Sequence, residues 1–333
     1  MFQTIIGAVS SFMYSKLLVI ILIGAGLYFT IRTRFPQVRL FERACESVME
    51  KPDDKEAISS FQALMVSTAS RVGTGNIVGV SSAICIGGFG SVFWMWVIAI
   101  IGSASALIES TLAQIYKRKG KDGECYGGPA YYIEAALHCR PLAIIFCISM
   151  IATYAFGFNM LASYNLQSTF SGFSFYDVKW TPWIIGGILA VITGWCLLGG
   201  GSRIVKVTST LVPAMGVAYI LISVIVMIIN RAYLPVVFSK IISEAFDFKA
   251  IFGAFAGSAM MQGIRRGLYS NEAGIGSAPN ASASGAFPIP ALSSTIQNAL
   301  IITPAFRIMH SLSYKQQTLR DSIMHPYIQA HKD

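Results

Sequence analysis

Charged residues are scarce in this 333-residue chain, and their scarcity excludes most soluble classes of protein. Only 12% of the residues are Asp, Glu, Lys or Arg, and 54% are hydrophobic, whereas a soluble domain carries roughly 25% charged residues. The net charge of +9 does not indicate a nucleic-acid-binding protein, because the Lys and Arg lie mostly in short loops between apolar runs. The composition predicts an all-α polytopic membrane protein, with the lipid bilayer as its surroundings.

Residues that usually carry enzyme chemistry are also few. The four histidines lie outside the long apolar runs and show neither metal-ligand spacing nor a Ser-His-Asp pattern. The six cysteines include no Cys-x-x-Cys pair, and four lie in or beside apolar runs, where they act as small hydrophobes. Residues 1–30 lack a basic segment and a cleavage site, so 17–31 is expected to remain as a first helix. These absences predict no enzyme, no transition-metal site and no organic cofactor.

Seven apolar runs reach the length of about 20 residues that one membrane crossing needs. They cover roughly 12–31, 59–88, 91–116, 141–165, 182–200, 209–230 and 250–285. The second and the seventh are too long for one straight span. Glycines interrupt both, at Gly73 and Gly75 in the second and from Gly263 to Gly276 in the seventh. Each is therefore predicted to be two half-helices with a non-helical join.

The basic loops predict the orientation of these spans. Lys and Arg are concentrated at residues 32–55 and 117–121, and Arg203 and Lys206 follow the fifth span. By parity all three segments lie on one side, so the positive-inside rule makes them cytoplasmic and places the N-terminus outside. The second span then runs outward and the seventh inward. This is the arrangement of an inverted repeat, in which two broken helices meet at a midplane site.

Six motifs occur along the chain in the order found in one transporter family. They are Gly26–Arg32 with Phe35–Gln37, Val72–Gly79, Gly87–Gly102, Glu109–Tyr116, Tyr126–Tyr132 and Arg266–Pro279. Over about residues 15–285 the chain resembles the alanine/glycine:cation symporters, also called the sodium:alanine symporters. The resemblance implies a LeuT-like inverted-repeat fold in a bacterial or archaeal plasma membrane. It also implies import of a small neutral amino acid, alanine or glycine, coupled to sodium or sometimes to protons.

The two interruptions offer the groups that a zwitterionic amino acid requires. The turn Gly73-Thr74-Gly75-Asn76 begins a half-helix, whose N–H groups and positive dipole end favour a carboxylate. We expect the substrate to be bound by residues of both breaks, with two residues of the fourth span added by the family resemblance. These candidates are Gly73, Thr74, Gly75, Asn76, Asn271, Gly274, Phe156 and Asn159.

Sodium, a hard cation, prefers about five or six oxygen ligands, by analogy with other hard-ion sites. The candidate cation ligands are Gly73, Thr74, Asn76, Ser270 and Asn271. Other roles remain open at this stage, since Asn76 and Asn271 could instead cap their half-helices. Glu272 could pair with neighbouring arginines, and Glu109 could either hold an ion or reach water near the cytoplasmic surface.

The C-terminal end is expected to differ from the rest. Residues 1–285 are read as the symporter domain, and 286–333 as a polar tail without the family motifs and without another apolar run of 20 residues. The resemblance implies about four further helices in this region. The sequence is therefore interpreted as a symporter truncated or frameshifted after about residue 285, and a non-transporting remnant is the alternative to an active transporter.

Overall fold

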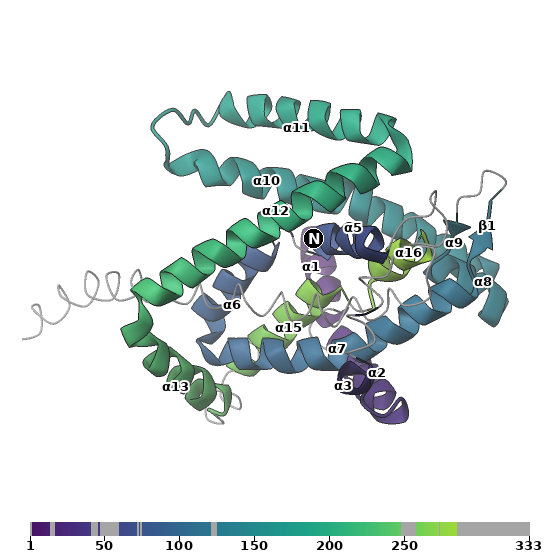
Figure 1. Ribbon diagram of the computed structural model, residues 1–333, viewed down its shortest axis with the longest axis horizontal. Helices are drawn as coiled ribbons and strands as arrows, with labels where there is room; N and C mark the ends of the chain where they lie inside the picture. The colour runs from purple at the N-terminus through teal and green to yellow at the C-terminus, as the bar shows by residue number, and fades with distance from the viewer. Residues whose placement is uncertain are drawn as a thin grey trace, which may run out of the picture.

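The computed structural model describes residues 2–13, 17–40, 46, 60–71, 73, 75–120, 125–247, 258–272 and 274–284. These residues are mainly helical, as Figure 1 shows. Within the described ranges the one sheet is a two-stranded antiparallel ribbon, β1 (Arg118–Lys119) with β2 (Cys125–Tyr126). The predicted all-α class is confirmed for this part of the chain.

Four helices of the described chain are long and apolar enough to cross a membrane. They are α7 (Gly90–Ile115), the continuous run Arg140–Gly172, α11 (Thr181–Leu198) and α12 (Gly200–Ile229). The run Arg140–Gly172 comprises α9 (Arg140–Ile151), the π-helix η3 (Ala152–Phe158), α10 (Asn159–Thr169) and the 3-10 turn η4 (Phe170–Gly172). It continues about seven residues beyond the expected fourth span, 141–165.

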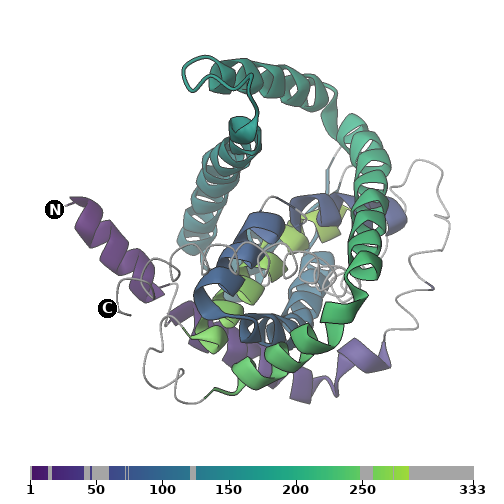
Figure 2. The same cartoon turned by 90° about the vertical axis from the view of Figure 1, so that its left-hand side faces the viewer.

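The apolar helices differ sharply in how much of their surface the protein covers. About half of the most apolar stretch of α7 is buried, whereas the corresponding stretches of α11, α12 and Arg140–Gly172 are almost entirely exposed. Figures 1 and 2 show these three helices around the edge of a group formed by α5, α6, α7, α15 and α16. Continuous apolar surface of this kind is what a helix presents to lipid.

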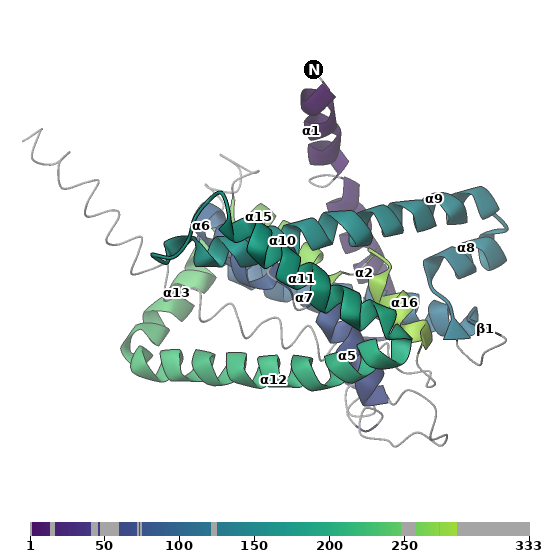
Figure 3. The ribbon, with the colours of Figure 1, turned by 90° about the horizontal axis from the view of Figure 1, so that it is seen from above.

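The N-terminal segment supplies three further helices. They are α1 (Phe2–Phe12), α2 (Leu18–Arg32) and α3 (Pro36–Arg39). α1 projects from the other helices (Figure 3), whereas α2 packs against α7. There Val19 joins a buried cluster with three residues of α7 and α15, which are Ile98, Ile264 and Leu268. The expected retained first span corresponds to α2.

Two helical segments are broken, as the glycines predict. The first consists of α5 (Ser60–Arg71), the π-helix η2 (Gly75–Gly79) and α6 (Val80–Gly87), and the second of α15 (Ala259–Asn271) and α16 (Ser277–Ser284). α5 packs against α16, and α6 packs against α15. The first half of each segment therefore lies beside the second half of the other, so the two segments run in opposite directions. The loop charges predict the same opposition.

The second break is shorter than the sequence suggests. α15 continues through Gly263 and Gly267. Both lie so close to α7 that a larger residue would not fit without a shift. A Cβ atom at Gly263 would overlap the backbone oxygen of Ser91, and one at Gly267 would lie 3.0 Å from Ile98. The helix ends only after Asn271, where Gly274 and Gly276 take positive φ angles of 81° and 94°. Two of the glycines in the expected break thus serve helix packing.

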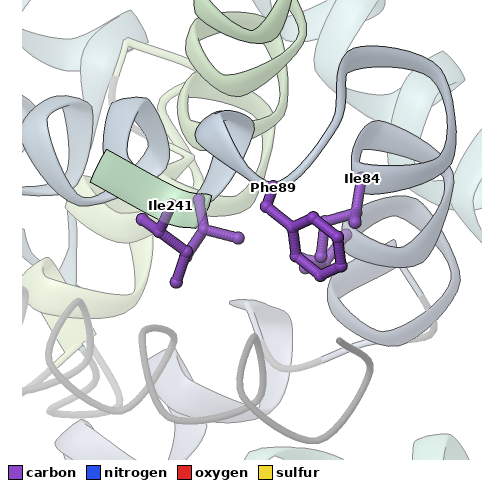
Figure 4. Close-up of a cluster of buried hydrophobic side chains, with 5 residues drawn as sticks. Ile84, Phe89 and Ile241 are labelled. Carbon is purple, nitrogen blue, oxygen red and sulfur yellow. The ribbon is translucent and has the colours of Figure 1, made fainter. Parts of the chain in front are cut away.

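Helix α13 (Leu234–Ala245) was not among the predicted elements. It follows α12 through the 3-10 turn η5 (Arg231–Tyr233) and packs against the turn that joins α6 to α7. Ile241 is fully buried there with Val80, Ile84, Phe89 and Val92, as Figure 4 shows in part. The Phe89 N–H donates to Oε2 of Glu244 at 2.6 Å. α13 therefore covers the turn at one end of the two helices.

Helix α8 (Pro129–Leu137) occupies a similar position at the opposite end of α7. The turn before it approaches α16 closely, since a Cβ atom at Gly127 would lie 2.5 Å from Cβ of Ala283. Gly128 has a φ of 125°, a conformation that favours glycine. The Gly-Gly-Pro motif at 127–129 thus lets backbone pack directly on the second half of a broken helix.

Candidate functional site

The first break leaves helical geometry at the residues expected from the sequence. Gly73 is exposed and its carbonyl accepts a hydrogen bond from the Asn76 N–H at 3.0 Å. The chain then forms one π-helical turn, Gly75–Gly79, a feature that occurs often at functional sites. The Asn76 side chain is 4% exposed and faces the protein interior. Thr74 lies outside the described residues.

The second break centres on Glu272, which has a left-handed φ of 49°. Its Oε2 accepts a hydrogen bond from the hydroxyl of Ser277 at 2.5 Å, at the residue where α16 begins. A carboxylate suits this position because the start of a helix is positively polarised. The adjacent Asn271 is 1% exposed, and its Nδ2 donates to the Ile98 carbonyl of α7 at 3.3 Å. Both side chains are therefore fixed against neighbouring structure.

Glu109 of α7 is part of this second break. Its Oε1 accepts a hydrogen bond from the Gly274 N–H at 2.8 Å. The sequence left open whether Glu109 reaches water, and the structure places it against the interrupted backbone. The Gly274 N–H, a candidate donor to the substrate, is engaged by this carboxylate. Burial, with a further contribution from the negative charge of Glu109, raises the pKa of Tyr132 in α8, so Glu109 also lies near that helix.

Arg266 connects the two broken segments. Its guanidinium covers Gly79 of the first segment so closely that a Cβ there would overlap Nη1. Its Nε donates to Oγ of Ser270 at 3.1 Å, and its Cζ lies 4.8 Å from the ring centre of Tyr269. A cation bound by Ser270 would meet the positive charge of this guanidinium. The positive charge of Arg266 therefore disfavours a cation at Ser270. The role of Ser270 as a cation ligand stays a prediction.

The two candidates of the fourth span have exposed side chains. The Phe156 side chain is 66% exposed. The side-chain amide of Asn159 is exposed and donates to the Ala155 carbonyl of its own helix at 3.1 Å. Phe158 instead faces α15, with its ring centre 6.0 Å from that of Tyr269. Phe158 lies two residues from Phe156, on another face of the helix, and no pattern in the sequence shows which of these faces meets α15. Substrate binding by Phe156 and Asn159 stays a prediction.

The structure brings the two segments that carry the other candidates into contact. Asn76 and Gly75 of the first break lie on η2, which contacts α15, and Asn271 ends α15. Helical spans of membrane length, together with two antiparallel broken helices, define a multi-pass membrane protein of the broken-helix type. A family model described as the sodium:alanine symporter family matches residues 1–306. The chain belongs to this family, whose members are transporters and not enzymes.

Curated relatives agree with this assignment. The chain is 42% identical over 314 residues to the amino-acid carrier protein AlsT of Bacillus subtilis, covering 94% of this chain and 66% of the relative. It is 40% identical over 314 residues to the probable sodium/glutamine symporter GlnT of the same organism, covering 94% of this chain and 65% of the relative. It is 38% identical over 289 residues to the sodium/alanine symporter AgcS of Methanococcus maripaludis, covering 85% of this chain and 63% of the relative.

These matches bear on the C-terminal region. The chain spans just under two thirds of the length of the relatives named above. The family match continues past residue 285, to residue 306. A frameshift at that point therefore finds no support in the comparisons. The residues after 284 lie outside the described structure.

Proposed function

We propose that this protein has a LeuT-like inverted-repeat architecture and carries a small neutral amino acid, alanine or glycine, into the cell together with sodium. The observation that carries the proposal is the antiparallel pair of broken helices, α5–α6 and α15–α16, in contact with each other. Interrupted helices of opposite direction are the usual setting of a midplane substrate site in secondary transporters. Family membership supports transport as the class of function.

The helix ends at the two breaks suit a zwitterion. At each break one half-helix ends, with a negative dipole end, and another begins, with a positive one. Gly75 begins η2, and in this proposal backbone N–H groups at the start of that turn bind the substrate carboxylate, while the Asn76 N–H donates to the Gly73 carbonyl. In this proposal carbonyl groups at the ends of α5 and α15 bind the ammonium group. Alanine and glycine need little more than these contacts, because their side chains add at most one methyl group.

The sodium ligands in this proposal are oxygens of both breaks. Gly73, Thr74 and Asn76 belong to the first break and Asn271 to the second. The side-chain oxygen of Asn271 is buried without a hydrogen-bond partner in the described structure, which leaves it available for a cation. Hard cations favour such carbonyl-type oxygens.

The substrate class can be tested directly with the full chain in proteoliposomes. Uptake of labelled alanine, glycine and glutamine would be measured under an inward sodium gradient, and again with a proton gradient in its place. We expect uptake of alanine or glycine that depends on sodium. Glutamine belongs in the test because one relative is named for it, and preferential glutamine uptake would overturn the substrate assignment.

A matched pair of variants locates the site. Asn76→Ala removes a buried amide at the first break, and we expect it to abolish sodium-dependent uptake while the protein still inserts in the membrane. Asn230→Ala is the control, because Asn230 ends α12, and its Nδ2 bonds only locally to the Val226 carbonyl at 2.9 Å. Unchanged uptake in Asn76→Ala would remove this residue from the site.

A further inference from the structure

Two buried side-chain oxygens near the second break have no hydrogen-bond partner in the described part of the chain. They are Oδ1 of Asn271 and Oγ of Ser105 in α7. The two residues are 1% and 3% exposed, so bulk water does not reach them. A buried polar group without a partner is costly. A bound cation or water molecule would supply the partner that these two oxygen atoms lack.

Contacts along α7 show which part of this helix lies beside the second break. α15 and α7 run in the same direction, since Gly263 lies against Ser91 and Gly267 against Ile98. Asn271 bonds to the Ile98 carbonyl, and further along the two chains Gly274 bonds to Glu109.

The part of α7 between Ile98 and Glu109 therefore lies opposite the break. Ser105 is in this part, one helical turn before Glu109, so the two side chains share a face of α7.

The chemistry of these groups favours a cation over a water molecule. Nδ2 of Asn271 is already used on the Ile98 carbonyl, so its amide offers the site only an oxygen. Glu109 adds a carboxylate whose Oε1 accepts a backbone N–H, a contact that favours the charged form. The Ser105 hydroxyl can accept as well as donate. The three oxygen groups carry one negative charge, which a hard cation neutralises and a water molecule does not.

We propose that Ser105, Glu109 and Asn271 form a sodium site between α7 and the break of the second segment, on the side of that break facing α7. The site shares Asn271 with the sodium ligands proposed above and adds two side chains of α7, and it rests on the proposed function only for the identity of the ion. The carboxylate of Glu272, held by Ser277 at the same break, contributes negative potential without being a ligand. An ion here joins α7 to the end of α15.

Sodium binding can be measured without transport. The full chain, in detergent, would be titrated with NaCl against choline chloride at constant ionic strength, and the thermal unfolding midpoint followed. We expect a saturable rise in the unmodified protein. In Ser105→Ala the half-saturating sodium concentration should increase roughly tenfold or more, the scale on which loss of a supporting group lowers metal affinity. Glu109→Gln keeps an oxygen for Gly274 and should show a larger increase.

Ser103→Ala is the matched control, because Ser103 is a buried serine of the same helix whose hydroxyl donates to the Ile100 carbonyl at 2.7 Å. It should leave the sodium response unchanged. Ser105→Ala breaks no internal hydrogen bond, so its midpoint without sodium should stay near that of the unmodified protein. This keeps an effect on sodium distinct from an effect on folding.

Three results would overturn the proposal. They are the absence of a sodium response in the unmodified protein, an unchanged response in both Ser105→Ala and Glu109→Gln, and an equal change in Ser103→Ala. Uptake decides the proposed function separately. A sodium response that depends on Ser105, in a protein without sodium-driven uptake, would support this site and contradict the transport proposal.

Discussion

The contact between α13 and the start of α7 yields a prediction whose size follows from the structure. The Phe89 N–H donates to Oε2 of Glu244 at 2.6 Å, and Phe89 is the residue before α7 begins. Hydrogen bonds to charged groups contribute about 1.5–3 kcal/mol. Glu244 is only partly buried, so a value of about 2 kcal/mol is appropriate. Glu244→Ala should therefore make opening of this turn easier by about this amount.

Hydrogen exchange of the peptide that contains Phe89 measures the effect locally. Since about 1.4 kcal/mol corresponds to a factor of ten, the Phe89 amide should exchange about 30-fold faster in Glu244→Ala. Glu244→Gln retains a neutral acceptor, worth about 1 kcal/mol. Its Phe89 amide should exchange at a rate between those of the unmodified protein and Glu244→Ala. Ser243→Ala is the control, because its exposed hydroxyl donates to the Lys240 carbonyl of the same helix. Equal exchange in all four proteins would refute the assigned role of Glu244.

Two further predictions concern packing and titration. Gly263→Ala should lower the thermal unfolding midpoint, since overpacking costs about 1–3 kcal/mol and the new methyl would overlap the Ser91 oxygen; Gly187→Ala, with no atom within 4 Å, should not. The raised pKa of Tyr132, above its ordinary 10.0, keeps the phenol neutral in the folded state while the unfolded state ionises. Stability should therefore fall as pH rises above 10, and Tyr132→Phe should show a smaller alkaline loss of midpoint than Tyr131→Phe.

The sequence predicted the helical class and both interruptions because clustered glycines rarely interrupt an apolar run unless the helix itself is broken or closely packed there. It did not distinguish a glycine that permits unwinding from one that permits packing. Gly274 and Gly276 have positive φ angles, whereas Gly263 and Gly267 are helical and touch α7. That difference depends on a neighbour about 170 residues away in the chain, which no local pattern contains.

Other features that the sequence did not predict also depend on contacts between residues far apart in the chain. α13 is a short amphipathic helix of 12 residues, below the length that identifies a span. Its importance comes from Glu244 and Ile241, which meet the α6–α7 turn only in three dimensions. Glu109 was a candidate with an open role, and its contact with Gly274 could not be read from a motif. Trp94 of α7 likewise donates its Nε1–H to the Ala245 carbonyl of α13 at 2.9 Å, across 151 positions of the chain.

The attachment of α13 has a mechanical consequence. One end of this helix is fastened to the start of α7 through Glu244 and Trp94, and the other end is joined to α12 by the short turn Arg231–Tyr233. The helix therefore links the start of α7 to the end of α12, and the turn is its connection to α12. A tilt of α6 and α7 relative to α12 would require the backbone angles of that turn to change. Substitutions that stiffen residues 230–233 should therefore restrict this motion without contacting either break.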